Sequence, residues 1–300
     1  MEGVRRILVA YDGSPDSKAS LEYAILLAKL TGASLDIVKV FETYAGDLMW
    51  AGGQNTTIIL EKLTAEKDDD RNLIDAACEQ CRGLGIAVKT ALLDGPVAAS
   101  LLDYAQKSNI DIIVAGNKGH GIFRQIITGS TTSRLVELSP VPVMVVKERS
   151  AVSGLKKLLL AYDGSGPSRN ALGWALAFCK AAGAELLAVT VADPSSLAMI
   201  YTLSGVESAE SFAGKIAAWV EEEKKLLAEI EEFGGASGVK VQTEGLQGNT
   251  VDTIIHYGNT NNVDMYVAGS KGRGAFEAML LGSVARGLVH LSPAPVLVVK

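Results

Sequence analysis

The sequence predicts an α/β protein built from two tandem domains, each with a five-stranded parallel sheet covered by helices on both faces. Apolar strand-like segments alternate with helix-like segments along the whole chain, an order typical of a parallel sheet. The landmarks of the first half return in the same order 151 to 153 residues later. A length of 300 residues suits two domains of ordinary size. We expect one domain over residues 1–149 and another over 150–300.

Matched motifs indicate that the chain is an internal duplication. Tyr11-Asp-Gly-Ser14 returns as Tyr162-Asp-Gly-Ser165, displaced by 151 residues, and Leu138-Ser-Pro-Val-Pro-Val143 returns as Leu291-Ser-Pro-Ala-Pro-Val296, displaced by 153. The offset grows by two residues between Val88/Val239 and Gly95/Gly248, which predicts one longer loop in the second copy.

Local signals assign each element of the first copy in order. Pro15 begins a helix and Gly32 ends it. The expected apolar face of this helix consists of Leu21, Ala24, Ile25 and Ala28. Short apolar runs predict the strands. The expected elements are strand 7–11, helix 15–31, strand 35–41, helix 60–82, strand 88–93, helix 97–108, strand 111–115, helix 130–138 and strand 142–146.

Composition narrows the class of protein. The formal charge is -6, and neither half has the basic excess expected of a surface for nucleic acid or anionic membrane. No apolar run approaches the roughly 18 residues of a membrane span, and the short strand after Arg5-Arg6 does not fit a signal peptide. We therefore expect a cytoplasmic protein without nucleic-acid or membrane partners.

Three cysteines fit a reducing compartment. Cys78-Glu-Gln-Cys81 has the spacing of a redox or metal motif, but its thiols share one apolar helical face with Ile74 and Ala77. No second Cys/His pair accompanies it. Because free cysteines are usually buried, we interpret both as core residues, and Cys179, at the position of Ala28, likewise.

An unusual glycine pattern occurs once in each copy. Gly116-Asn-Lys-Gly119 is followed after nine residues by Gly129-Ser130, and Gly269-Ser-Lys-Gly272 is followed after nine residues by Gly282-Ser283. Each follows an apolar strand and leads to a helix, an arrangement that aims backbone N–H groups at phosphate oxygens. In parallel sheets ligands lie beyond the carboxyl ends of the strands, where the turn Asp12-Gly13-Ser14 should meet this glycine turn. A carboxylate for ribose hydroxyls and amides for phosphates suit a nucleotide.

Commoner nucleotide motifs are absent. Neither copy contains the G-x-x-x-x-G-K-[ST] pattern of a Walker A loop, and Gly164-x-Gly166 lacks the further glycine, at Arg169, of a dinucleotide fingerprint. The G-x-x-G-x9-G-[ST] pattern after a fourth strand, beside a D-G-S turn after the first, resembles the ATP-binding branch of the universal stress protein family. The resemblance covers essentially the whole chain, and the motif is complete twice.

This resemblance implies an adenine nucleotide alpha hydrolase-like fold with strand order 3-2-1-4-5, and bound ATP, ADP or AMP, with magnesium beside a triphosphate. It implies that aspartates contact ribose or adenine, valines hold adenine through backbone groups, and the glycine turns surround the phosphates. The implied residues are Asp12, Gly13, Val40, Gly116, Gly119, His120, Gly129, Ser130 and Thr131 in the first copy, and Asp163, Gly164, Val191, Gly269, Gly272, Arg273, Gly282, Ser283 and Val284 in the second.

Each assignment has a purely structural alternative. The glycines can be simple turn formers, and Asp12 and Asp163 can cap the following helices. Ser130 and Ser283 can be N-caps as well, and His120 can be an exposed loop residue.

The sequence contains no Ser-His-Asp triad pattern in a suitable context and no plausible cluster of metal ligands. No carboxylate is obviously placed to activate water near the glycine turn. Catalysis is therefore weakly supported. We therefore favour a nucleotide-responsive regulatory or stress protein. The alternatives are a slow ATPase or a nucleotidyl- or phosphotransferase of related fold, and a structural protein that keeps the motifs without a ligand. The sequence does not identify a protein partner.

The last strands predict an assembly. Pro142-Val-Met-Val-Val146 and Pro295-Val-Leu-Val-Val299 are apolar edge segments, which invite aggregation unless they are paired. Single-domain members of the resembled family commonly pair through these strands. We therefore expect antiparallel pairing within the chain, a pseudo-dimer, with homodimerisation of the whole chain left open.

The two sites are expected to be unequal. Ser130-Thr131 in the first copy corresponds to Ser283-Val284, and Arg124 corresponds to Glu277. The second site thus lacks one hydroxyl and carries a negative charge in place of a positive one, which Arg273 partly offsets. We expect the first site to bind ATP more tightly.

Overall fold

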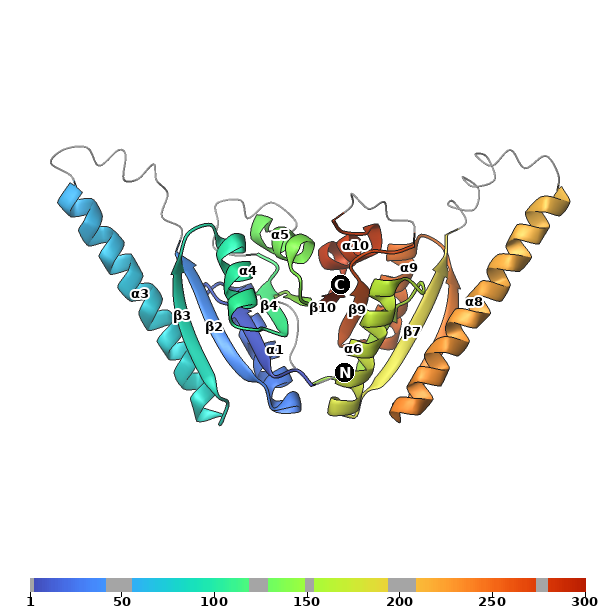
Figure 1. The fold of residues 1–300 in the computed structure, drawn as a ribbon, viewed down its shortest axis with the longest axis horizontal. Helices are drawn as coiled ribbons and strands as arrows, with labels where there is room; N and C mark the ends of the chain where they lie inside the picture. The colour runs from blue at the N-terminus through green and yellow to red at the C-terminus, as the bar shows by residue number, and fades with distance from the viewer. Residues whose placement is uncertain (1–2, 42–55, 119–128, 149–153, 194–208, 274–279) are drawn as a thin grey trace. The chain divides into compact units, whose positions relative to one another are not determined.

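The chain divides into two compact units, Glu2–Val152 and Ser153–Lys300. The computed structural model describes residues 3–41, 56–118, 129–148, 154–193, 209–273 and 280–300. Within these residues each unit contains five strands and flanking helices (Figure 1). The domain boundary expected at residues 149 and 150 falls outside the described residues.

In the first unit all neighbouring strands run parallel, in the order β3-β2-β1-β4-β5. The strands are β1 (Arg6–Ala10), β2 (Ser34–Phe41), β3 (Val88–Asp94), β4 (Ile112–Gly116) and β5 (Val143–Val146). The helices are α1 (Pro15–Thr31), α3 (Thr56–Gly83), α4 (Val97–Lys107) and α5 (Ser130–Leu138). Predicted and observed bounds agree within one residue, except that α3 begins four residues before the expected position.

The second unit repeats this arrangement in the order β8-β7-β6-β9-β10. Its strands are β6 (Lys157–Ala161), β7 (Glu185–Ala192), β8 (Val241–Gln247), β9 (Met265–Gly269) and β10 (Val296–Val299). Its helices are α6 (Gly166–Ala182), α8 (Ala209–Ser237), α9 (Thr250–Asn261) and α10 (Ser283–Leu291). Helix α6 contacts α8, and α9 contacts α10, so two helix pairs cover the sheet. The implied strand order 3-2-1-4-5 is confirmed in both units.

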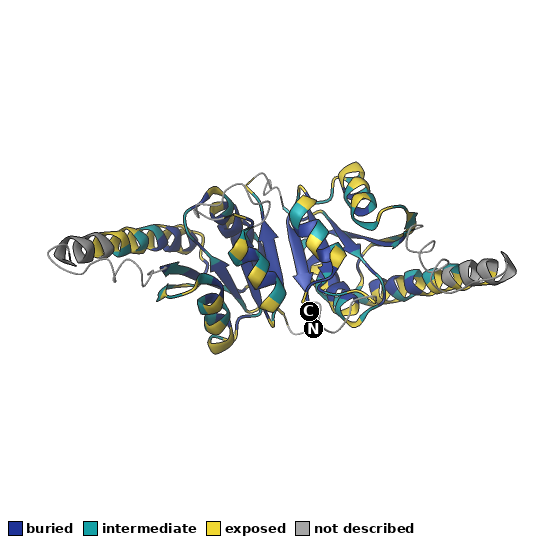
Figure 2. Ribbon diagram, turned by 90° about the horizontal axis from the view of Figure 1, so that it is seen from above, coloured by how far each residue is buried: buried dark blue, intermediate teal, exposed yellow. Residues whose placement is uncertain are grey.

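The central strands form the core of each unit (Figure 2). Strands β4 and β9 are buried at all but their last residue and β1 and β6 at their three central residues, whereas the outer strands β3 and β8 are partly exposed. The predicted apolar face of α1 is buried, which confirms that assignment. Among the described helices, none combines the length and apolarity needed to cross a membrane.

All three cysteines are free and buried, as predicted. Burial raises the pKa of the Cys81 thiol to about 11 and that of Cys179 to about 12. Because the thiolate is the reactive form, these groups are packing residues near neutral pH.

Strand register corrects one part of the repeat alignment. The sequence comparison pairs Val88 with Val239, but Leu35 lies beside Val88 in the first unit and Leu186 lies beside Val241 in the second. The counterpart of Val88 is therefore Val241. The extra two residues lie earlier, because 14 residues (42–55) separate β2 from α3 and 16 residues (193–208) separate β7 from α8.

Candidate functional site

The turn after the first strand of each unit is built around an aspartate and a serine. Ser165 caps α6 by accepting a hydrogen bond from the Ser168 N–H at 3.3 Å, and Ser14 caps α1 in the same way. The alternative in which Asp12 or Asp163 caps the helix is therefore wrong. Instead, Oδ1 of each aspartate accepts the N–H of the capping serine at 3.0 Å.

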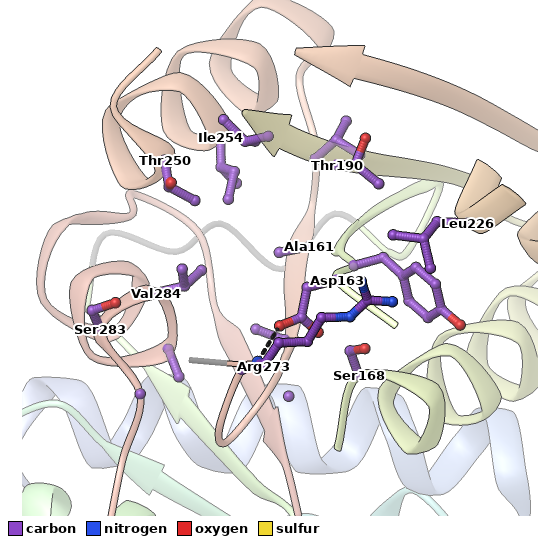
Figure 3. A pocket seen from close by; sticks show the side chains of 18 of the residues that line it. Ala161, Asp163, Ser168, Thr190, Leu226, Thr250, Ile254, Arg273, Ser283 and Val284 are labelled. Carbon is purple, nitrogen blue, oxygen red and sulfur yellow. Dashed lines mark hydrogen bonds between the residues drawn. The ribbon is translucent and has the colours of Figure 1, made fainter. Parts of the chain in front are cut away.

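In the second unit the same aspartate also holds the glycine turn. Asp163 Oδ2 accepts a hydrogen bond from the Arg273 N–H at 2.9 Å (Figure 3). Burial alone would raise the pKa of Asp163, but hydrogen bonds from Ser165, Ser168 and Arg273 outweigh it and lower the pKa. Asp163 and these bonds, which we call the aspartate clamp, join the turn after β6 to the turn after β9.

The glycine turn of the second unit closes on itself and leads into α10. The Gly282 N–H donates to the Ser270 carbonyl at 2.7 Å, and Gly282 is the N-cap of the helix. Ser283 is thus the first helical residue, and the alternative in which it is the N-cap is wrong. The first N–H groups of a helix have no partner within it, and Ser283, Val284 and Ala285 all line a cavity. This helix start can therefore bind an anion.

Two glycines of the pattern are explained by packing. A Cβ on Gly269 would lie 2.7 Å from the backbone of Ser168, and one on Gly116 would lie 3.0 Å from the backbone of Ser17. Both positions let the helix after the first strand begin against the end of the fourth strand. Gly272 serves the clamp, because its Cβ would lie 2.7 Å from Asp163 Oδ2.

A cavity of about 530 Å³ lies at the carboxyl ends of β6, β7 and β9 (Figure 3). Its volume is in the range of small-molecule sites. The structure brings eight of the nine residues expected in the second copy to its wall: Asp163, Val191, Gly269, Gly272, Arg273, Gly282, Ser283 and Val284. Gly164 is not part of the lining. Its φ is +72°, and an added Cβ would collide with Leu226 and Arg273.

The cavity has two chemically different ends. Ser283 and Val284 lie at one end and Thr190 and Leu226 at the other, with Asp163 between them (Figure 3). The second end includes side chains of α8 that sequence reasoning missed: Glu222, Glu223 and Leu226.

Arg273 extends toward α8, not only toward the glycine turn. Its Nη1 pairs with Glu222 Oε1, although the resemblance implies a place beside phosphate. The sequence signal for Glu222 was weak, because α8 carries many exposed acids.

The first unit keeps the same backbone frame. The Gly129 N–H donates to the Asn117 carbonyl at 2.9 Å, and α5 begins at Ser130, followed by Thr131. Gly129 is the N-cap, so the alternative in which Ser130 is the cap is wrong here too. Gly13 has a φ of +80°, and Val40 lies in β2 beside Leu93 of β3.

In the first unit Asp16 holds the glycine turn. Asp16 Oδ2 accepts the Lys118 N–H at 2.8 Å, and Asp16 Oδ1 accepts the Glu148 N–H at 2.7 Å. Pro167 occupies the equivalent position in the second unit. Gly119, His120 and the spacer residues Arg124 and Glu277 lie outside the described residues.

Fold and site together define a tandem doubly wound α/β protein with a cavity beyond the carboxyl ends of its strands. The model of the universal stress protein family matches residues 3–147 and 154–300. The chain therefore belongs to the universal stress protein family.

Similar proteins span either the whole chain or one copy. A universal stress protein of Mycolicibacterium smegmatis is 26% identical over 305 residues, covering 98% of this chain and 96% of the relative. One of Methanocaldococcus jannaschii is 31% identical over 145 residues, covering 48% of this chain and 82% of the relative. The crystal structure of a universal stress protein from Archaeoglobus fulgidus matches with a TM-score of 0.70 and 21% identity, covering 98% of both chains.

Proposed function

We propose that each copy binds an adenine nucleotide, ATP, ADP or AMP, and that the protein is a regulatory stress-response module that responds to it. One observation carries the proposal. In the second unit, residues from three separate turns converge on one cavity that also contains a helix start able to bind an anion. Strand order and the closed glycine turn repeat in the first unit, which supports a second site.

The two ends of the cavity suit the two ends of a nucleotide. Phosphates fit the α10 start, where Ser283, Val284 and Ala285 offer amides. A flat base fits the other end, where Val189 and Leu226 supply apolar surface. Magnesium would be held chiefly by the phosphates and water, as is usual for this ion, because both Asp163 oxygens already accept hydrogen bonds from the protein.

The bonding and placement of the acids favour binding over catalysis. Both oxygens of Asp163 already accept hydrogen bonds from the protein, and Glu222 pairs with the Arg273 guanidinium. Glu223 is bound to Thr190, which lies at the end of the cavity opposite the helix start expected to hold the phosphates (Figure 3). A general base needs a free acceptor within reach of the attacking water. We therefore propose that nucleotide occupancy, rather than turnover, is the output of the site.

Calorimetric titration with ATP tests the proposal. A valine at Gly272 would press on Asp163 Oδ2 and fill the glycine turn. The double variant Gly119→Val/Gly272→Val should remain folded by circular dichroism and lose heat of ATP binding. Gly166→Ala is the matched control, because an added Cβ there meets nothing within 4 Å. Unchanged ATP affinity in the folded double variant would contradict the proposal.

A further inference from the structure

A hydrogen-bonded pair, Thr190 and Glu223, lies at the end of the cavity opposite α10. The buried Thr190 donates its hydroxyl to Glu223 Oε1 at 2.7 Å. Both residues line the cavity, and Glu223 is half-buried. Within the described part of the chain, Glu223 Oε2 accepts no hydrogen bond. The pair therefore presents a fixed carboxylate with a free acceptor.

The sheet makes room for this carboxylate. Thr190 lies beside Gly245 of β8, and a Cβ on Gly245 would collide with the Glu223 carboxylate. The glutamate can therefore lie against the strand only because position 245 has no side chain. Such an arrangement fixes the rotamer of a long acidic side chain, which is otherwise costly in entropy.

The first unit differs at all three positions. Lys39 takes the place of Thr190 and lies beside Leu92, which takes the place of Gly245. Lys39 Nζ is 3.2 Å from Asp70 Oδ1, so a cation neutralises the acid there. The second unit instead has a neutral hydroxyl, a longer acid and a glycine. These three linked differences make the acceptor a feature of the second cavity.

The chemistry of the acceptor identifies the ligand group. An ionised carboxylate accepts N–H and O–H donors and repels phosphate. Thr190, which binds Glu223, lies with Leu226 at the end away from the anion-binding helix start (Figure 3), and Val189 adds apolar surface to the same cavity. In a nucleotide that enters with its phosphates at α10, the donor at this end is the exocyclic amino group of the base.

We propose that Glu223, held by Thr190, recognises the amino group of the nucleobase in the second cavity and gives this site, but not the first, a preference for adenine. The inference rests on the proposed nucleotide binding. A site built to hydrogen-bond an N–H donor rejects the analogue that lacks it, because the buried acceptor is then left without a partner.

The test compares ATP with purine riboside 5′-triphosphate, which lacks only the 6-amino group. Titrations of the full chain labelled with ¹⁵N follow the amide resonances of Gly272 and Gly282, which report the second site alone. ATP should bind this site about 10- to 100-fold more tightly than the analogue. Glu223→Gln should reduce that ratio at least several-fold, because an amide can rotate to donate as well as accept.

Two matched variants separate base recognition from a general charge effect. Glu222→Gln removes the neighbouring acid and should change the affinities for both nucleotides in parallel. Asp70→Asn alters the equivalent position of the first unit and should leave the second-site ratio unchanged. The inference would be overturned by a wild-type affinity ratio near one between ATP and the analogue, or by a parallel change in both affinities in Glu223→Gln. Either result would leave the proposal of nucleotide binding intact.

Further ligands distinguish the remaining sources of a donor. If Glu223→Gln lowers discrimination against 2′-deoxy-ATP and leaves the purine riboside ratio intact, the glutamate contacts ribose and the inference is wrong. If neither nucleotide shifts the Gly272 and Gly282 resonances, nucleotide binding at this cavity fails, and the inference fails with it.

Discussion

The aspartate clamp predicts a local loss of stability in Asp163→Asn. Asparagine keeps one acceptor, which can still take the Ser165 N–H, but its Nδ2 then faces the Arg273 N–H. The variant thus loses one hydrogen bond to a charged acceptor and places two donors, the Asn Nδ2 and the Arg273 N–H, against each other. Such a bond contributes about 1.5–3 kcal/mol. The turn after β9 should therefore open more often, while the rest of the unit stays folded.

Hydrogen exchange of the Arg273 amide measures this opening directly. A loss of about 1.5–3 kcal/mol corresponds to exchange roughly 10- to 150-fold faster at this amide. Amides in β6 should keep their protection. Asp12→Asn is the control, because it alters the equivalent residue of the other unit and should leave Arg273 unaffected. Unchanged Arg273 exchange in Asp163→Asn would refute the reasoning.

The pH dependence of the clamp follows from the same bonds. The pKa of Asp163 is lower in the folded protein than in the unfolded chain, so folding favours its ionised form. Its contribution is therefore fully present above the ordinary aspartate pKa and is lost as pH falls through the folded value. Arg273 exchange, corrected for its intrinsic pH dependence, should accelerate below about pH 4, and this acceleration should be absent in Asp163→Asn.

Two further predictions concern the first unit. Asp36 is 1% exposed and accepts hydrogen bonds from Arg6 and Tyr104. Asp36→Ala leaves both donors without this partner and should lower the free energy of unfolding of the unit, measured in urea, by about 3 kcal/mol. A loss below about 1 kcal/mol would contradict this. The first site should bind ATP more tightly, so Gly272→Val, which leaves that site intact, should show the higher affinity in calorimetry. Equal affinities in Gly272→Val and Gly119→Val, or a higher one in Gly119→Val, would show that the residue differences do not act as argued.

Element order was predictable because each signal was local. Pro15 and Gly32 delimit α1, whose C-cap Gly32 has a φ of +75° that glycine adopts readily. The offset between copies was harder to place. Gly238-Val-Lys-Val241 offers two valines, and only strand pairing shows that Val241, not Val239, is the counterpart of Val88.

The site was predictable only in part, because some contacts depend on proximity across the fold. The glycine pattern located the turns, and eight of the nine expected residues of the second copy line one cavity. The bond from Arg273 N–H to Asp163 joins residues 110 positions apart. Glu223 follows Thr190 by 33 positions and carries no motif. Its one sequence signal is the linked change at Thr190 and Gly245 between the copies.

Native mass spectrometry of the full chain with Mg-ATP tests the central claim most directly, because it counts the bound nucleotides. We predict two nucleotides on the wild-type chain and one on the folded Gly272→Val variant. Denaturation of the purified protein should release an adenine nucleotide of the same mass. Spectra without any bound nucleotide, or with equal counts for the wild type and Gly272→Val, would contradict the account.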